Sequence, residues 1–120
     1  AVEYTQMRMQ FGRAIGSFQA IKHKLADMLL EVELAKSAAY GAAQAAAEGS
    51  DETGALASLA KAALSDAYLQ TAANTIQLHG GIGFTWDNDT HLWFKRAKSS
   101  EVLLGDATYH RELLMQRWDV

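Results

Sequence analysis

Hydrophobic residues recur at helical spacing along two long stretches of this chain. From residue 18 to about residue 47 they follow an i, i+4, i+7, i+11 stripe, and charged residues such as Lys24 occupy much of the other side. The stripe consists of Ile21, Leu25, Met28 and Val32, widened by Leu29 and Leu30. From about residue 52 to 79 runs a narrower stripe of Leu56, Leu59, Ala63, Ala67 and Ile76. This pattern predicts two long helices, and their many alanines favour close helix packing.

Glycines and short polar residues predict where helices end and begin. Residues 1 to about 10 have the pattern of the last turns of a helix, and the two glycines in residues 11–16 predict a loop. Gly49 and Gly105 are expected to interrupt the helical pattern later in the chain. The expected N-caps are Ser17, then Ser50 or Asp51, then Asp87 or Asp89, and finally Asp106. Because neither strand-type alternation nor an internal repeat is found, the chain is predicted to be all-α, an antiparallel (up-and-down) four-helix-type bundle.

Composition limits the class of protein. A chain of 120 residues forms one domain at most, and 49% hydrophobic residues with a mean hydropathy of −0.12 indicate a globular fold. The formal charge of −3 gives no indication of nucleic-acid binding, and the absence of cysteine excludes disulfides and thiolate chemistry. Proline is also absent, as suits long helices. The chain begins at Ala1 without methionine or an N-cap, so we expect it to be a fragment of a longer protein.

The segment from Gln77 to Phe84 is the strongest candidate for chemistry. It contains three glycines in four residues, whereas a helix C-terminus needs only one. The surplus suggests that a ligand or a partner chain lies against this turn. Backbone N–H groups that no side chain covers could bind an anion there. A loop that simply needs flexibility is the alternative, and the turn alone does not decide between the two.

Other polar residues give weaker signals. Arg8, Gln10 and Phe11 place a guanidinium, an amide and an aromatic ring at a helix-to-loop junction. Arginine is well suited to bidentate phosphate recognition, but a solvated arginine is common at a helix end. Gln19 could bind a ligand or be solvated. The four histidines do not form i, i+3 or i, i+4 pairs, so no metal site is predicted.

Taken in their order and spacing, three motifs resemble the C-terminal helical domain of the acyl-CoA dehydrogenase superfamily. They are Arg8-x-x-Phe11-Gly12, Phe18-Gln19, and Gln77-Leu78-His79-Gly80-Gly81-Ile82-Gly83-Phe84. Thr85-Trp86-Asp87 and Lys95-Arg96-Ala97-Lys98 strengthen the resemblance, which covers essentially the whole chain. Full-length members carry an N-terminal helical domain and a middle β-domain before this one, and we expect both to be missing from these residues.

The resemblance implies a flavoprotein of the kind that serves fatty-acid β-oxidation. Such enzymes use FAD to oxidise the Cα–Cβ bond of an acyl-CoA thioester, and they pass electrons to an electron-transferring flavoprotein. It further implies a homo- or hetero-tetramer, here in a bacterial cytoplasm. The implied FAD-binding residues are Arg8 on the pyrophosphate, Phe11 packing on the cofactor, Gln10 and Gln19 as polar contacts, and Gln77, Leu78, Gly80 and Gly81 around the ADP half of a neighbouring subunit's FAD.

One position departs from the family pattern. Many members carry a catalytic Glu-Gly where this chain has Leu104-Gly105, and leucine cannot take a proton. Glu101 and Asp106 are nearby acids, but either would need a shifted backbone. The base is therefore expected upstream of Ala1 or, alternatively, on the partner subunit of a heteromeric enzyme; we favour the first.

Three rivals to a dehydrogenase domain remain open. They are a flavin oxidase of the same superfamily, a non-catalytic partner subunit, and a helical interaction module without a ligand. As a dehydrogenase domain, the isolated chain is expected to be inactive, since the flavin ring, the thioester pocket and the base would depend on other domains.

Overall fold

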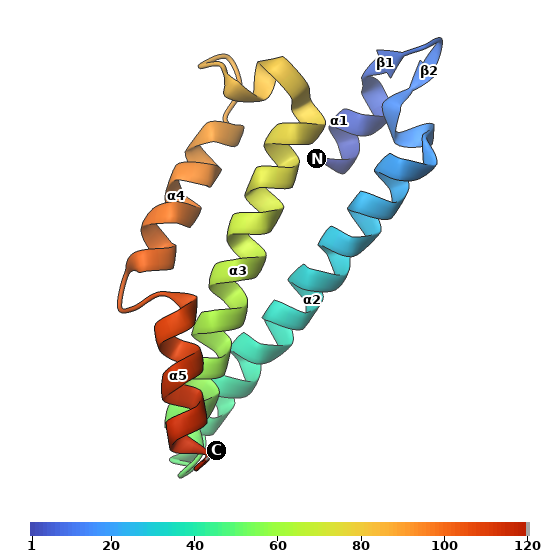
Figure 1. Cartoon of the computed structure of the whole chain (residues 1–120). Coiled ribbons are helices and arrows are strands. Elements are labelled where there is room, and N and C mark those ends of the chain that lie inside the picture. Colours follow the sequence, from blue (N-terminus) through green and yellow to red (C-terminus); the bar gives the residue numbers. More distant parts are fainter. Residues whose placement is uncertain (120) are drawn as a thin grey trace.

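The computed structural model describes residues 1–119, and in it the other long elements pack around one central helix (Figure 1). The main helices are α2 (Gln19–Glu48), α3 (Thr53–His79), α4 (Thr90–Val102) and α5 (Ala107–Arg117). Helix α3 lies in the middle, α2 runs antiparallel along one side of it, and α4 and α5 follow one another along the other side (Figure 1). The predicted all-α, up-and-down bundle is confirmed.

The N-terminal segment differs from the prediction of a helix followed by a loop. A short helix, α1 (Val2–Met7), leads into a two-stranded antiparallel hairpin of β1 (Met9–Gln10) and β2 (Arg13–Ala14). The short 3₁₀ helix η1 (Ile15–Ser17) then leads to α2. The sequence shows no strand-type alternation here, because strands of two residues are too short to produce an alternating pattern.

Two predicted helix boundaries are confirmed by their geometry. Gly49 follows α2 in the left-handed conformation, with φ of 67°, which is the usual role of glycine at a helix C-terminus. The Asp106 carboxylate accepts a hydrogen bond of 2.8 Å from the backbone N–H of Tyr109 and caps α5.

The other predicted N-caps differ from what the structure shows. The Ser17 hydroxyl donates to the Ala14 carbonyl, and Phe18 stands at the N-cap of α2 instead. The Ser50 hydroxyl accepts from the N–H of Glu52 within the turn, ahead of a helix that begins only at Thr53. Asp89 does stand at the N-cap position of α4, but its side chain makes no capping hydrogen bond; the Asn88 amide oxygen accepts from the N–H of Thr90 instead. Several short polar residues stood near each boundary, and only the backbone path decides which one can reach an N–H.

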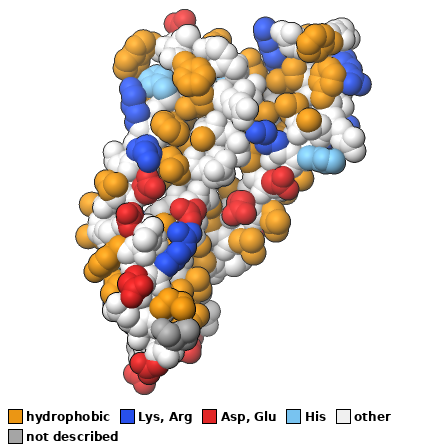
Figure 2. Space-filling model, in the orientation of Figure 1, with side chains coloured by type: hydrophobic (Ala, Val, Ile, Leu, Met, Phe, Trp, Pro, Cys, Tyr) orange, Lys and Arg blue, Asp and Glu red, His pale blue; other side chains and the backbone are white. Residues whose placement is uncertain are grey.

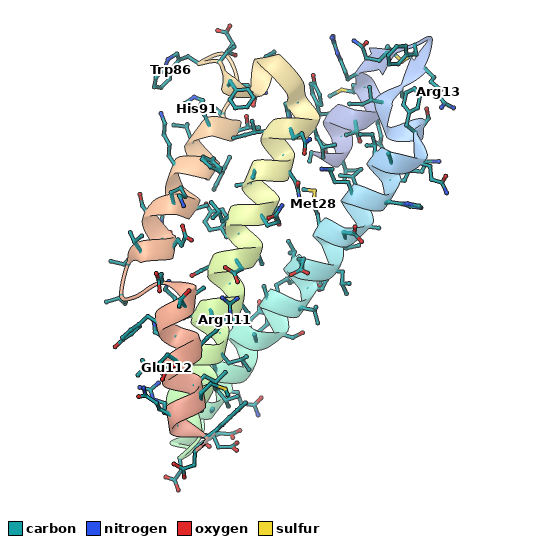
Figure 3. All side chains as sticks on the ribbon, viewed as in Figure 1. Arg13, Met28, Trp86, His91, Arg111 and Glu112 are labelled. Carbon is teal, nitrogen blue, oxygen red and sulfur yellow. The ribbon has the colours of Figure 1, made fainter. Side chains whose placement is uncertain are left out.

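The buried core consists mainly of small residues. Nine residues of α3 are buried, and most are alanine or serine, because α3 has neighbours on several sides. Met28 on α2 is one of the few large buried side chains and points toward α3 (Figure 3). The molecule measures 56 × 26 × 25 Å with a radius of gyration of 17.3 Å, whereas a compact chain of this length would have about 13–14 Å.

Many large hydrophobic side chains therefore lie on the surface (Figure 2). On α2 the exposed ones are Leu29, Leu30, Leu34 and Tyr40, each more than half exposed. Exposed apolar surface of this extent is typical of a protein that is covered by other subunits or domains. Across residues 1–119, no helix has both the length and the apolar character needed to cross a membrane.

Candidate functional site

The two segments that carry the predicted site meet at one end of the molecule. The Tyr4 ring on α1 stacks on the His79 ring at the end of α3, with ring centroids 4.0 Å apart and planes 22° apart. The Tyr4 hydroxyl also donates to the His79 carbonyl at 3.4 Å, across 75 residues of sequence. Helix α1 leads directly to Arg8 and His79 directly to Gly80, so this contact holds the hairpin and the glycine turn at the same end of the molecule (Figure 1).

Phe11 is presented to solvent at the tip of the hairpin. It is 90% exposed and has a φ of 54°, a left-handed conformation that a bulky residue rarely adopts. With Gly12 at a φ of 77°, the pair resembles a type I′ turn, in which asparagine is usual at the first position. The Phe11 ring meets the Phe18 ring edge-on at 6.1 Å. Such a conformation costs roughly 1–3 kcal/mol and is found mainly at binding sites.

Cations and amides accompany Phe11 at this end of the molecule. The Arg13 guanidinium lies 3.9 Å above the Phe18 ring, and Figure 2 shows Lys and Arg side chains beside hydrophobic ones on the hairpin end. Arg8, Gln10 and Gln19 are all exposed. Among the ion pairs of residues 1–119, none involves Arg8. This surface has the chemistry to bind a ligand that is both anionic and aromatic.

The three glycines of the turn have different roles. The turn forms the 3₁₀ helix η2 (Gly80–Phe84), so some of its N–H groups bond within it. Gly80 has a φ of 66° and ends α3. Gly83 is buried, and a β-carbon there would lie 2.7 Å from the Ile76 carbonyl oxygen. The surplus of glycine is therefore partly explained by backbone conformation and packing. Among these three glycines, only Gly81 is not required by the fold itself, because a β-carbon there would meet no atom within 4 Å.

Gln77 and Leu78 face opposite environments. The Leu78 side chain is buried, so only its backbone could contact a ligand. Gln77 is exposed, and its amide oxygen accepts a hydrogen bond of 2.7 Å from Lys24 on α2. Sequence reasoning placed Lys24 on the solvated side of its helix and missed this contact, because no local pattern signals a bond between residues 53 positions apart.

Leu104, at the position of the missing base, lies in the loop between α4 and α5. It is 81% exposed, has a φ of 62°, and its carbonyl accepts a hydrogen bond of 2.8 Å from the His110 ring. The Glu101 carboxylate pairs with Lys98 at 2.8 Å, and Asp106 caps α5, so both nearby acids already have partners. The 13 residues of α4 separate this loop from the glycine turn, a rise of about 20 Å along the helix.

Comparison with known proteins agrees with this arrangement. Residues 1–118 match the family model described as the acyl-CoA dehydrogenase C-terminal domain. The chain is 47% identical over 103 residues to the acyl-CoA dehydrogenase IpdE2 of Mycobacterium tuberculosis, covering 86% of this chain and 30% of that protein. It thus spans under a third of the length of that relative.

Solved structures show the same fold. Butyryl-CoA dehydrogenase from Megasphaera elsdenii superposes with a TM-score of 0.93 at 29% identity, over 99% of this chain and 31% of that one. A steroid ACAD named Tcur3481-Tcur3483 gives a TM-score of 0.93 at 33% identity, over 98% of this chain and 32% of that one.

Proposed function

The chain belongs to the acyl-CoA dehydrogenase superfamily, as its C-terminal domain, and from this premise we propose that it supplies FAD contacts and subunit-interface surface to an FAD-dependent acyl-CoA dehydrogenase. The observation that carries the proposal is the stack of Tyr4 on His79, which joins the two motif-bearing segments at one end of the bundle.

The residues of this end fit the cofactor. Arg8, which has no ion-pair partner among the described residues, binds the pyrophosphate, and the exposed Phe11 ring packs on the cofactor. Gly81 leaves room for close approach of the ribose or phosphate of a neighbouring subunit's FAD. The remaining contacts come from Gln10, Gln19, Gln77, Gly80 and the backbone of Leu78.

The proposed reaction is the α,β-dehydrogenation of an acyl-CoA thioester. Bound FAD would supply the hydride acceptor for the β-carbon. This chain contributes binding and orientation, because Leu104 stands at the usual base position and cannot take the α-proton. The proposed electron acceptor is an electron-transferring flavoprotein, and the proposed setting is the cytoplasm, in a longer chain that also carries the N-terminal helical and middle β-domains.

The apolar surface of α2 supports an oligomer. Leu29, Leu30 and Leu34 are each more than half exposed, and apolar side chains in such a row are normally covered in the working assembly. We assign this face to subunit contacts in a homo- or hetero-tetramer.

A second candidate function is a base-lacking partner subunit of a heteromeric dehydrogenase. The supporting observation is Leu104, which is 81% exposed in a left-handed conformation at the place where the base would stand. Mixing the full-length protein with acyl-CoA distinguishes the two: a self-sufficient enzyme bleaches its own flavin, whereas a partner subunit bleaches only in complex with a second chain.

The Arg8→Ala variant of the full-length protein tests the proposed cofactor site. Loss of a charge-assisted phosphate contact should weaken FAD binding about tenfold or more, measured by flavin fluorescence on titration. Arg96→Ala, which removes an exposed arginine from α4, is the matched control and should bind FAD normally. Equal FAD affinity in both variants would overturn the proposal.

A further inference from the structure

Lys24 connects α2 to the end of α3 through side chains alone. Its ammonium nitrogen lies 2.7 Å from the amide oxygen of Gln77 and 3.4 Å from that of Asn74. Lys24 is half-buried, and no carboxylate within residues 1–119 pairs with it. The Lys24 ammonium therefore donates hydrogen bonds to two neutral amides instead of forming an ion pair.

The contact fixes which way the Gln77 amide points. An ammonium group has donors and no acceptor, so it must meet the oxygen of the amide and not its nitrogen. The NH₂ group of Gln77 is then turned away from Lys24, and in the described part of the chain it makes no hydrogen bond. Because Gln77 is exposed, two N–H donors are offered to solvent at the start of the glycine turn.

The geometry points to Lys24 as a positioning residue that makes Gln77 a hydrogen-bond donor to the oxygen atoms of the cofactor. This inference rests on the proposed FAD site, which has Gly80 and Gly81 within four residues of Gln77. The acceptors would be phosphate or ribose oxygens, since both need donors. The ammonium also polarises the amide and strengthens its N–H groups.

Gln77→Glu in the full-length flavoprotein separates this role from a purely structural one. Glutamate keeps an oxygen for Lys24 and turns the contact into an ion pair, but it replaces both donors by an acceptor. We expect the melting temperature of the apoprotein to be unchanged or higher and the FAD affinity to fall about tenfold or more. If Gln77 only linked the helices, FAD affinity would stay at the wild-type value.

Two further variants exclude simple charge repulsion. Gln77→Met removes the donors without adding charge and should also weaken FAD binding several-fold. Gln70→Glu makes the same change as Gln77→Glu at another exposed position of α3, and it should leave FAD binding unchanged. Wild-type affinity in Gln77→Met, or equal loss in Gln70→Glu, overturns the inference.

Substitutions at Lys24 complete the test. Lys24→Arg retains a donor for the Gln77 oxygen and should keep most of the FAD affinity, whereas Lys24→Met frees the amide to rotate and should lower the affinity several-fold. Equal affinities of these two variants would contradict a positioning role. If Arg8→Ala weakens FAD binding but Gln77→Glu does not, only this inference fails; if neither weakens it, the proposed cofactor site fails as well.

Discussion

Gly83 lies so close to the last turns of α3 that a β-carbon on it would stand 2.7 Å from the carbonyl oxygen of Ile76. Carbon atoms do not approach a backbone oxygen so closely, and backbone cannot swing aside as a long side chain can. The glycine turn is thus folded back onto its own helix, which brings Gly83 into the buried part of the molecule.

We predict that Gly83→Ala destabilises the protein by about 1–3 kcal/mol through overpacking. The denaturation midpoint in urea measures this. Gly81→Ala is the matched control, because a β-carbon at Gly81 meets no atom within 4 Å. Stability should be preserved in Gly81→Ala while FAD affinity falls, and equal destabilisation by both substitutions would show that the turn packs differently.

The stack of Tyr4 on His79 yields a second prediction. Tyr4→Phe keeps the ring and loses only the long 3.4 Å hydrogen bond, so FAD affinity should change less than about threefold. Tyr4→Ala removes the stack, which contributes about 0.5–1.5 kcal/mol beyond its buried area. It should lower FAD affinity several-fold more than Tyr4→Phe, as measured by equilibrium titration. Indistinguishable affinities would mean that the stack does not hold the two segments together.

The backbone of Leu104 supports a prediction about stability. Glycine adopts a φ near 62° without strain, so Leu104→Gly should stabilise the loop or leave its stability unchanged, with a gain of up to about 1 kcal/mol. Leu103 is also exposed but has an ordinary φ of −65°. Leu103→Gly should therefore cost about 0.5–1 kcal/mol of unfolding free energy. Thermal unfolding compares the two, and a larger loss in Leu104→Gly would contradict a strained Leu104.

The cap of α5 gives a fourth prediction. Asp106→Ala should lower the free energy of unfolding by about 1 kcal/mol, because the N–H of Tyr109 loses its acceptor. Asp106→Asn retains an acceptor oxygen and should cost much less. Asp87→Ala serves as the control, since the Asp87 side chain does not cap α4. It should fall within about 0.5 kcal/mol of the wild type in chemical denaturation.

Sequence patterns predicted correctly those structural features that depend only on residues close together in the chain. The 3.6-residue period of apolar residues placed α2 and α3 to within a residue or two, because a helix must turn one stripe toward its neighbours. Gly49 and Asp106 were recognised because a left-handed turn and an N-cap involve only the nearest residues. The family was indicated by the order and spacing of short motifs.

Contacts between distant residues could not be inferred in this way. The sequence placed Leu29 and Leu30 in the same stripe as Met28, yet only Met28 is buried, since the position of α3 decides which side of α2 is covered. The path of the backbone in three dimensions likewise decides three further features. They are the hairpin of two short strands, the cap that Asn88 provides for α4, and the close packing that only glycine allows at residue Gly83.

The sequence by itself determined the helical class, the main breaks between helices and the family of the domain, and it indicated the residues that we propose to bind FAD. Only the tertiary structure decided that Tyr4 meets His79, that Lys24 holds Gln77, and that the Leu104 loop lies away from the hairpin end. The reason is physical: helix formation and capping depend on neighbours within about four residues, whereas a binding surface depends on how whole helices pack against one another.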